Sequence, residues 1–318
     1  FWPAGTLPSQ MSILSAERAI QAAGIDRRHV GALVHGSVCR DFLEPATACS
    51  VHHGLALRPD CLVFDLSNAC LGLLNGIVTV ANMIELGQIR AGVVVGTEGG
   101  RSLVENTIDS LNRDQSLTRK TIKYAVASLT IGSASCAAVL CDEELSRTGN
   151  RIRAATAHAN TQFHDLCRGG EEAAAGGSVA PLMRTDSERL MHEGIATGAA
   201  TFERFLADAG WTRDDVTKTF CHQVGSMHHK LMFEALGLEP RGDYTTLQWL
   251  GNTGSCALPT TMAIGIERGH LQRGDRVGML GIGSGINCLM LGVDWQESLL
   301  APAAQTRHSK RADATPAV

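Results

Sequence analysis

The chain has 318 residues, of which 44% are hydrophobic and 19% are charged. This composition is typical of a globular protein with two domains or one large α/β unit, and it excludes a disordered or fibrous chain. The formal net charge of −4 supplies no basic field for a nucleic acid or an anionic membrane, so we expect neither partner. Because no run of about 18 apolar residues and no signal-peptide pattern is present, we expect a cytoplasmic protein without a membrane span.

Helical and strand-like segments alternate along the chain. Residues 9–23 have the apolar spacing of a helix. Short apolar runs at residues 32–34 and 61–66 are typical of buried strands, and a long apolar helix is expected over residues 72–86. Residues 91–95 resume as a strand. This order predicts a parallel or mixed sheet covered by helices.

The sequence also contains an internal repeat. The same spacing separates Cys70 from Asn252, Gly72 from Gly254, and Glu85 from Glu267. Two copies of an α/β unit of roughly 150 residues predict a duplicated fold with a pseudo-twofold axis, and chance similarity between two α/β hairpins is the alternative. We expect the halves to span residues 1–147 and 148–300, followed by a disordered tail over residues 301–318.

The repeat places Cys70 and Asn252 at the N-terminal ends of two central helices. Such a position favours the thiolate and is expected to lower the pKa of Cys70, with Asn68 as the helix cap. The alternative is that Cys70 is one of ten cysteines that serve as small core residues. His222 follows a strand-like stretch and is the candidate partner. A cysteine, a histidine and an asparagine at the ends of facing elements can activate a thiol and bind a thioester oxygen.

Neither a metal nor a nucleotide cofactor is expected. The cysteines show no Cys-x-x-Cys pair and no zinc-ligand spacing. The glycine-rich residues 281–285 are not a Gly-x-Gly-x-x-Gly turn that opens a helix, so a dinucleotide site is not predicted.

Four ordered motifs together resemble the thiolase-like condensing enzymes, and specifically the ketoacyl synthase III branch. They are residues 68–72 (NACLG), 222–223 (HQ), 251–254 (GNTG) and 281–285 (GIGSG), and the likeness extends over about residues 9–295. Residues 37–45 (SVCRDFLEP) and 68–76 (NACLGLLNG) are still more similar to the OleA-type enzymes, which join two long acyl-CoA thioesters head to head.

The resemblance implies a duplicated thiolase fold with five αβαβα layers, from which the family's N-terminal strand and helix are missing here. It implies acyl-CoA as the substrate, no cofactor, and a homodimer or a heterodimer with a homologous subunit. In this mapping Cys70 is the nucleophile, and main-chain N–H groups of Cys70 and Ser284 form the oxyanion hole. His222 and Asn252 stabilise the enolate of the second thioester, and Glu44 is supplied across the dimer.

Glu44 is the feature that favours a non-decarboxylative reaction. Removing an α-proton without losing carbon dioxide requires a positioned base, whereas a decarboxylative synthase requires none. The product would be a β-keto acid or thioester. Three alternatives stay open: Glu44 as a solvated loop residue, a decarboxylative 3-oxoacyl-carrier-protein synthase III, and a non-catalytic partner subunit. Residues 224–227 (VGSM) depart from the ketoacyl synthase III pattern, which argues against docking of a carrier protein.

Overall fold

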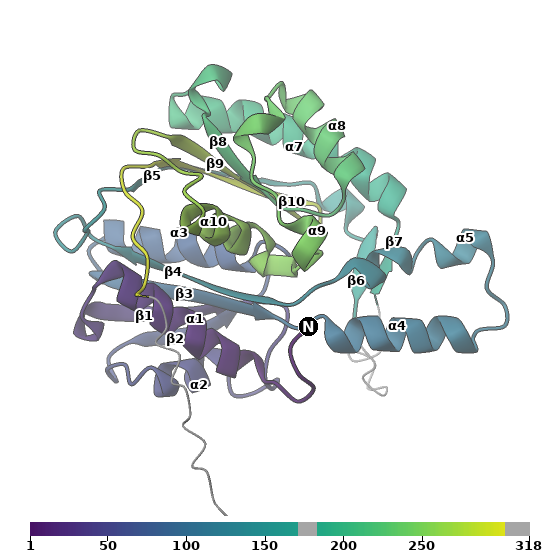
Figure 1. Cartoon of the computed structure of the whole chain (residues 1–318), viewed down its shortest axis with the longest axis horizontal. Coiled ribbons are helices and arrows are strands. Elements are labelled where there is room, and N and C mark those ends of the chain that lie inside the picture. The colour runs from purple at the N-terminus through teal and green to yellow at the C-terminus, as the bar shows by residue number, and fades with distance from the viewer. Residues whose placement is uncertain (171–182, 303–318) are drawn as a thin grey trace, which may run out of the picture.

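Two four-stranded sheets form the frame of the molecule, with helices around and between them (Figure 1). The computed structural model describes residues 1–170 and 183–302. Residues 303–318, which make up most of the predicted tail, therefore lie outside the described residues. Within the described part of the chain, no helix has both the length and the apolar character needed to cross a membrane.

Sheet 1 belongs to the N-terminal half and has the strand order β2-β1-β3-β4. Its strands are β1 (Val30–Gly36), β2 (Leu62–Leu66), β3 (Ala91–Glu98) and β4 (Ala134–Cys141). β1 pairs in parallel with both β2 and β3, and β4 runs antiparallel to β3. Nearly every residue of β1 and β3 is buried, as their continuous apolar runs predict.

Sheet 2 belongs to the C-terminal half and has the strand order β5-β10-β9-β8. Its strands are β5 (Arg151–Ala159), β8 (Lys218–Cys221), β9 (Arg276–Gly283) and β10 (Asn287–Asp294). β8 runs parallel to β9, whereas β10 is antiparallel to both β9 and β5. A separate two-stranded ribbon pairs β6 (Cys167–Gly169) with β7 (Met183–Thr185).

Helices cover both faces of each sheet and complete the five layers (Figure 1). Sheet 1 is covered on its outer face by α1 (Pro8–Ala23) and α2 (Thr47–Gly54), and sheet 2 by α7 (Ser187–Ala209) and α8 (Ser226–Leu236). Between the sheets lie α3 (Gly72–Glu85) and α10 (Ala257–Glu267). The other α-helices among the described residues are α4 (Arg101–Arg113) and α5 (Arg119–Ile122), which project to one side, and α9 (Leu247–Leu250).

Three apolar cores separate these layers. The central core joins both sheets through α3 and α10, and the other two lie under α1 with α2 and under α7 with α8. On sheet 1, α1, α2 and α3 occupy the places that α7, α8 and α10 occupy on sheet 2, as the internal repeat predicts. Sheet 1 ends at Cys141 and sheet 2 begins at Arg151, and a division at residue 147 stays a prediction.

Candidate active site

Cys70 lies in the tight connection between β2 and α3, against the end of β9. The preceding residue, Ala69, adopts a left-handed conformation with φ 44°, which costs a non-glycine residue roughly 1–2 kcal/mol. A side chain at Gly283 would place its Cβ 3.5 Å from the Cys70 nitrogen and 3.6 Å from the Cys70 Cβ. These are ordinary van der Waals distances, so the end of β9 packs directly against Cys70.

Two main-chain donors act on the Cys70 sulfur. The backbone N–H groups of Cys70 itself and of Ser284 hydrogen-bond to the thiol, and both lower its pKa. These are the two groups that the resemblance to the thiolase-like condensing enzymes implies for the oxyanion hole. They belong to opposite halves of the chain and converge on one atom.

The prediction of a lowered pKa for Cys70 is wrong. Burial raises the pKa of this thiol to about 12, the negative charge of Glu98 adds to the effect, and Cys167 of β6 contributes further. α3 begins two residues later, with Leu71 at its N-cap position and no side-chain cap, so the helix terminus does not outweigh desolvation. Asn68 does not cap the helix either, because its side chain bonds to Asn75 and Asn287.

His222 directly follows β8, and its side chain is buried, with 5% of its surface exposed. Its backbone N–H donates to the Leu280 carbonyl of β9 at 3.2 Å, which ties it to the strand whose end abuts Cys70. Burial, assisted by His228, lowers the pKa of His222 to about 4. The ring is therefore neutral near pH 7, and its Nδ1 has no hydrogen-bond partner among the described residues.

Asn252 lies in a turn that is anchored to the N-terminal half. Its N–H donates to the Thr130 carbonyl at 2.9 Å, and its own carbonyl accepts from the Gly132 N–H at 2.8 Å. The Asn252 Oδ1 accepts from the Gly254 N–H at 3.0 Å. The turn leads into α10, just as residues 68–71 lead into α3.

Glu44 is not brought to this site by its own chain. It lies at the exposed tip of the loop between β1 and α2, beside Phe42 and Leu43, and Leu43 is 91% exposed. No hydrogen bond or ion pair of the Glu44 carboxylate is present within residues 1–170 and 183–302. Within a single chain, the geometry is that of the solvated loop glutamate.

Sequence reasoning missed two polar residues of the site. Glu98 ends β3 as a buried carboxylate, and Gln223 bonds through its side chain to the backbone of Tyr244, Thr246 and Leu247. The signal for Glu98 is an acidic residue that directly continues an otherwise apolar strand. For Gln223, which belongs to the His-Gln motif, no pattern in the sequence indicates the segment that it contacts.

A cavity of about 250 Å³ opens beside His222, between sheet 2 and the helices α7 and α8. Most of its lining is apolar, including Met232 and Phe233 of α8 and Met290 of β10, and His222 and His228 supply polar groups. An apolar cavity next to a reacting centre is suited to a hydrocarbon chain. Within the described residues, no cluster of three or more His, Cys, Asp or Glu side chains is arranged to hold a metal ion.

The five layers, with Cys70 and Ser284 meeting at the end of β9 and His222 at the end of the neighbouring strand β8, are those of a condensing enzyme of the thiolase superfamily. Residues 206–295 match the model of the C-terminal domain of 3-oxoacyl-[acyl-carrier-protein] synthase III. Over most of its length the chain is similar to acyl-CoA:acyl-CoA alkyltransferases. The relative from Shewanella oneidensis is 42% identical over 93% of this chain and 85% of that protein, and the one from Xanthomonas campestris is 31% identical over 92% and 84%.

Solved structures give the same result. Crystal structures of OleA from Xanthomonas campestris superpose with a TM-score of 0.86 at 31% identity, covering 93% of this chain and 83% of that one. They include OleA with a single cysteine, glutamate or histidine replaced, OleA with cerulenin, and OleA with lauric acid and lauroyl-CoA. The chain belongs to the acyl-CoA:acyl-CoA alkyltransferase family.

Proposed function

We propose that the chain transfers a fatty acyl group from CoA to Cys70 and condenses it with a second acyl-CoA, without decarboxylation, to a β-keto product. The observation that carries this proposal is the Cys70 thiol, which receives hydrogen bonds from the Cys70 and Ser284 N–H groups. The names of the relatives and the lauroyl-CoA complex of OleA support the substrate class.

The first step transfers the acyl group. The Cys70 sulfur attacks the thioester carbonyl, a new carbon–sulfur bond forms, and CoA leaves as its thiol, carrying the proton that Cys70 loses. The N–H groups of Cys70 and Ser284 bind the oxyanion that forms during the attack. Burial raises the pKa of Cys70 to about 12, so the thiol is protonated near pH 7 and loses its proton only as the sulfur attacks.

The second step forms the carbon–carbon bond. Glu44 removes an α-proton from the second acyl-CoA, and His222 and Asn252 hydrogen-bond to the enolate oxygen. A neutral imidazole is suited to this task because it can donate one N–H without carrying a charge. The enolate carbon attacks the acyl group on Cys70, the carbon–sulfur bond breaks, and the proton that Glu44 removed returns to the departing thiolate to regenerate the thiol. The electrons balance with two thioesters alone, so the proposal includes no cofactor.

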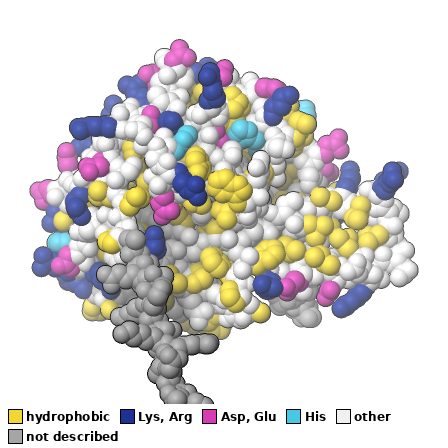
Figure 2. All heavy atoms as spheres, in the orientation of Figure 1, with side chains coloured by type: hydrophobic (Ala, Val, Ile, Leu, Met, Phe, Trp, Pro, Cys, Tyr) yellow, Lys and Arg dark blue, Asp and Glu magenta, His cyan; other side chains and the backbone are white. Residues whose placement is uncertain are grey.

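A second copy of the chain would supply Glu44. The loop that carries it exposes Phe42 and Leu43, and Leu62 is exposed on β2, a strand at the edge of sheet 1. Figure 2 shows further apolar side chains over the α4 and α5 region, where Ile108 and Ile122 are exposed. Apolar surface of this extent is typical of an interface. A homodimer places Glu44 near a neighbouring Cys70, and a heterodimer with a homologous subunit is the alternative.

The state of the cysteines supports a cytoplasmic location. All ten carry free thiols in the structure. Disulfides persist in oxidising compartments and are rare in the cytosol, where thiols are kept reduced. A cytoplasmic enzyme would also meet acyl-CoA directly.

Mass spectrometry after exposure to lauroyl-CoA tests the first step, with an acyl adduct on Cys70 as the expected result. Product analysis with acyl-CoA as the sole substrate tests the second step and should detect a β-keto product. A folded protein that gains no adduct would be a non-catalytic subunit. Adduct formation without a product from acyl-CoA alone would also contradict condensation of two acyl-CoA molecules.

A decarboxylative synthase is the second candidate. The matching C-terminal family model and a ketoacyl-[acyl-carrier-protein] synthase III from Sphingopyxis alaskensis, 23% identical over 85% of this chain and 78% of that protein, favour it. That reaction depends on a malonyl thioester. Product formation that requires a malonyl thioester would select this candidate over ours.

A further inference from the structure

Glu98 is a buried carboxylate without a cation. It is the last residue of β3, and only 6% of its surface is exposed. Within the described part of the chain, all of its side-chain partners are hydrogen-bond donors without charge. A buried negative charge is costly unless several donors satisfy it. Four hydrogen bonds satisfy the carboxylate here, and an apolar residue in its place could accept none of them.

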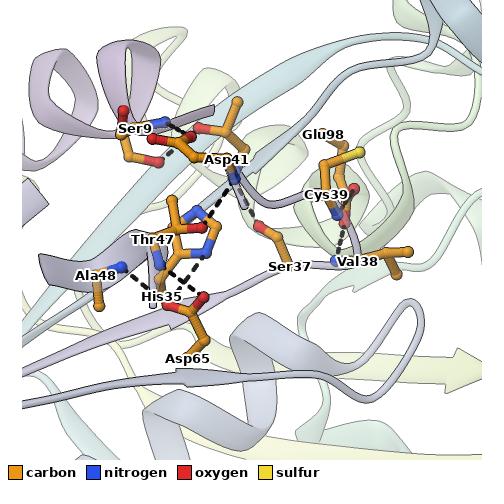
Figure 3. A network of polar contacts seen from close by, with 12 residues as sticks. Ser9, His35, Ser37, Val38, Cys39, Asp41, Thr47, Ala48, Asp65 and Glu98 are labelled. Carbon is orange, nitrogen blue, oxygen red and sulfur yellow. Dashed lines mark hydrogen bonds and ion pairs between the residues drawn. The ribbon is translucent and has the colours of Figure 1, made fainter. Parts of the chain in front are cut away.

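Those donors come from two segments that are far apart in the sequence. From the N-terminal half, Val38 N–H donates to Oε1 at 3.0 Å and Cys39 N–H donates to Oε2 at 3.2 Å (Figure 3). From the C-terminal half, the Ser255 hydroxyl donates to Oε1 at 2.6 Å and its N–H at 3.3 Å. One carboxylate thus joins the two halves.

The first segment is the start of the loop that carries Glu44. A few residues further on, Asp41 Oδ1 accepts from the Ser9 N–H at 2.9 Å, and Asp41 N–H donates to Thr47 Oγ1 at 3.1 Å (Figure 3). The loop is therefore fixed on both sides of its exposed tip, and Glu98 holds its Val38–Cys39 part.

The second segment is the turn that carries Asn252. Gly254 has φ +57°, and a Cβ at this residue would lie 3.2 Å from the carboxylate carbon of Glu98. Glycine therefore allows the turn to close over the carboxylate. Ser255 completes the contact three residues after Asn252, so the place of Asn252 depends on Glu98 as well as on Thr130 and Gly132.

We propose that Glu98 is a positioning residue for condensation, which holds the Glu44 loop and the Asn252 turn in one fixed relation. This inference rests on the proposed function. Both segments act on the second acyl-CoA, so their misplacement should slow condensation more than the acylation of Cys70. The Glu98 charge also raises the pKa of Cys70, which gives the residue a signature that a merely structural role lacks.

The test compares Glu98→Gln with Ser255→Ala. A glutamine turns an amide N–H toward the Cys39 N–H and removes the charge, whereas Ser255→Ala keeps the charge and removes one donor. Condensation by Glu98→Gln should fall about 10²-fold, because a misplacement of about 1 Å has an effect of that size. Acylation, followed by mass spectrometry, should fall much less. Alkylation of Cys70 by iodoacetamide should shift to lower pH in Glu98→Gln and keep its pH profile in Ser255→Ala.

Glu144→Gln is the matched control, because Glu144 is an exposed carboxylate beyond β4 that pairs with Arg90 and lies outside the proposed interface. It should behave as the wild type in all three assays. Equal losses of acylation and condensation in Glu98→Gln, or wild-type condensation, would overturn the inference. If Glu98→Gln does not fold, the loss of condensation is compared with the loss of acylation in Ser255→Ala instead. A wild-type chain that makes no product refutes the proposed function instead.

Discussion

The loops that follow β1 and β8 occupy equivalent places in the two halves, yet one turns into the protein and the other extends into solvent. After β8, His222 turns into the protein, and Gln223 locks the neighbouring backbone at Tyr244 and Thr246. After β1, the loop is fixed on both sides of its tip, and the tip itself exposes Leu43 and Glu44 to solvent. A duplicated frame can therefore direct one loop into its own active site and the equivalent loop outward, where we propose that it serves a second copy.

Replacing Cys70 should have the largest effect, because it removes the atom to which both halves converge. We expect Cys70→Ala to lose more than about 10³-fold in product formation, as nucleophile deletions do elsewhere. Mass spectrometry should then find no acyl adduct on the protein. Cys256→Ala is the control, since this buried thiol of the α10 region should leave acylation intact. Acylation of another cysteine in Cys70→Ala would contradict the assignment.

Mixing two inactive variants tests the outward-facing loop. Glu44→Gln should reduce condensation by about 10²–10⁴-fold, the usual contribution of a positioned base, while acylation of Cys70 continues. If Glu44 acts across a dimer, subunit exchange between Glu44→Gln and Cys70→Ala restores one complete site in each mixed dimer. At random exchange we expect about one quarter of the wild-type rate. A mixture that stays inactive after confirmed exchange would show that Glu44 does not act in trans.

The buried loop should make stability depend on pH. The folded-state pKa of His222 is lowered to about 4 from 6.5. The folded state therefore binds a proton at His222 less readily than the unfolded state does. The neutral ring contributes its full stabilisation above pH 6.5, and this contribution is lost as the pH falls toward 4. The shift corresponds to about 3 kcal/mol between pH 7 and pH 4. Urea unfolding at both pH values should show that the free energy of unfolding falls less from pH 7 to pH 4 in His222→Gln than in the wild type. Equal losses would contradict the buried neutral ring.

Local patterns in the sequence predicted the central strands and the duplication. The apolar runs at β1 and β3 and the repeat that relates Cys70 to Asn252 predict buried strands and a duplication, and the structure has both. These patterns are informative because a strand that is buried on both faces has a continuous apolar run, which can be recognised in that segment alone. The resemblance then supplied the layer order that periodicity could not.

The electrostatics of the site were not predictable in the same way. The pKa of Cys70 depends on desolvation and on Glu98, and neither can be seen in the residues next to Cys70. The prediction from the helix terminus considered only the groups next to Cys70, and it gave the wrong direction for the shift of the Cys70 pKa. Glu98 shows the same limit, because its partners Val38 and Ser255 come from distant segments. The effect of a charge on a group that is distant in the sequence can be predicted only when the three-dimensional structure is known.

Filling the cavity beside His222 should have the smallest effect and would show whether an acyl chain lies there. Met232 of α8 lines this cavity and is buried, whereas Met227 of the same helix is 60% exposed and does not line it. We expect Met232→Trp to lower kcat/KM for a sixteen-carbon acyl-CoA relative to an eight-carbon one by about tenfold, because the larger ring occupies space that the longer chain needs. Met227→Trp should leave the ratio unchanged. If both variants keep the wild-type ratio while remaining folded, the acyl chain lies elsewhere.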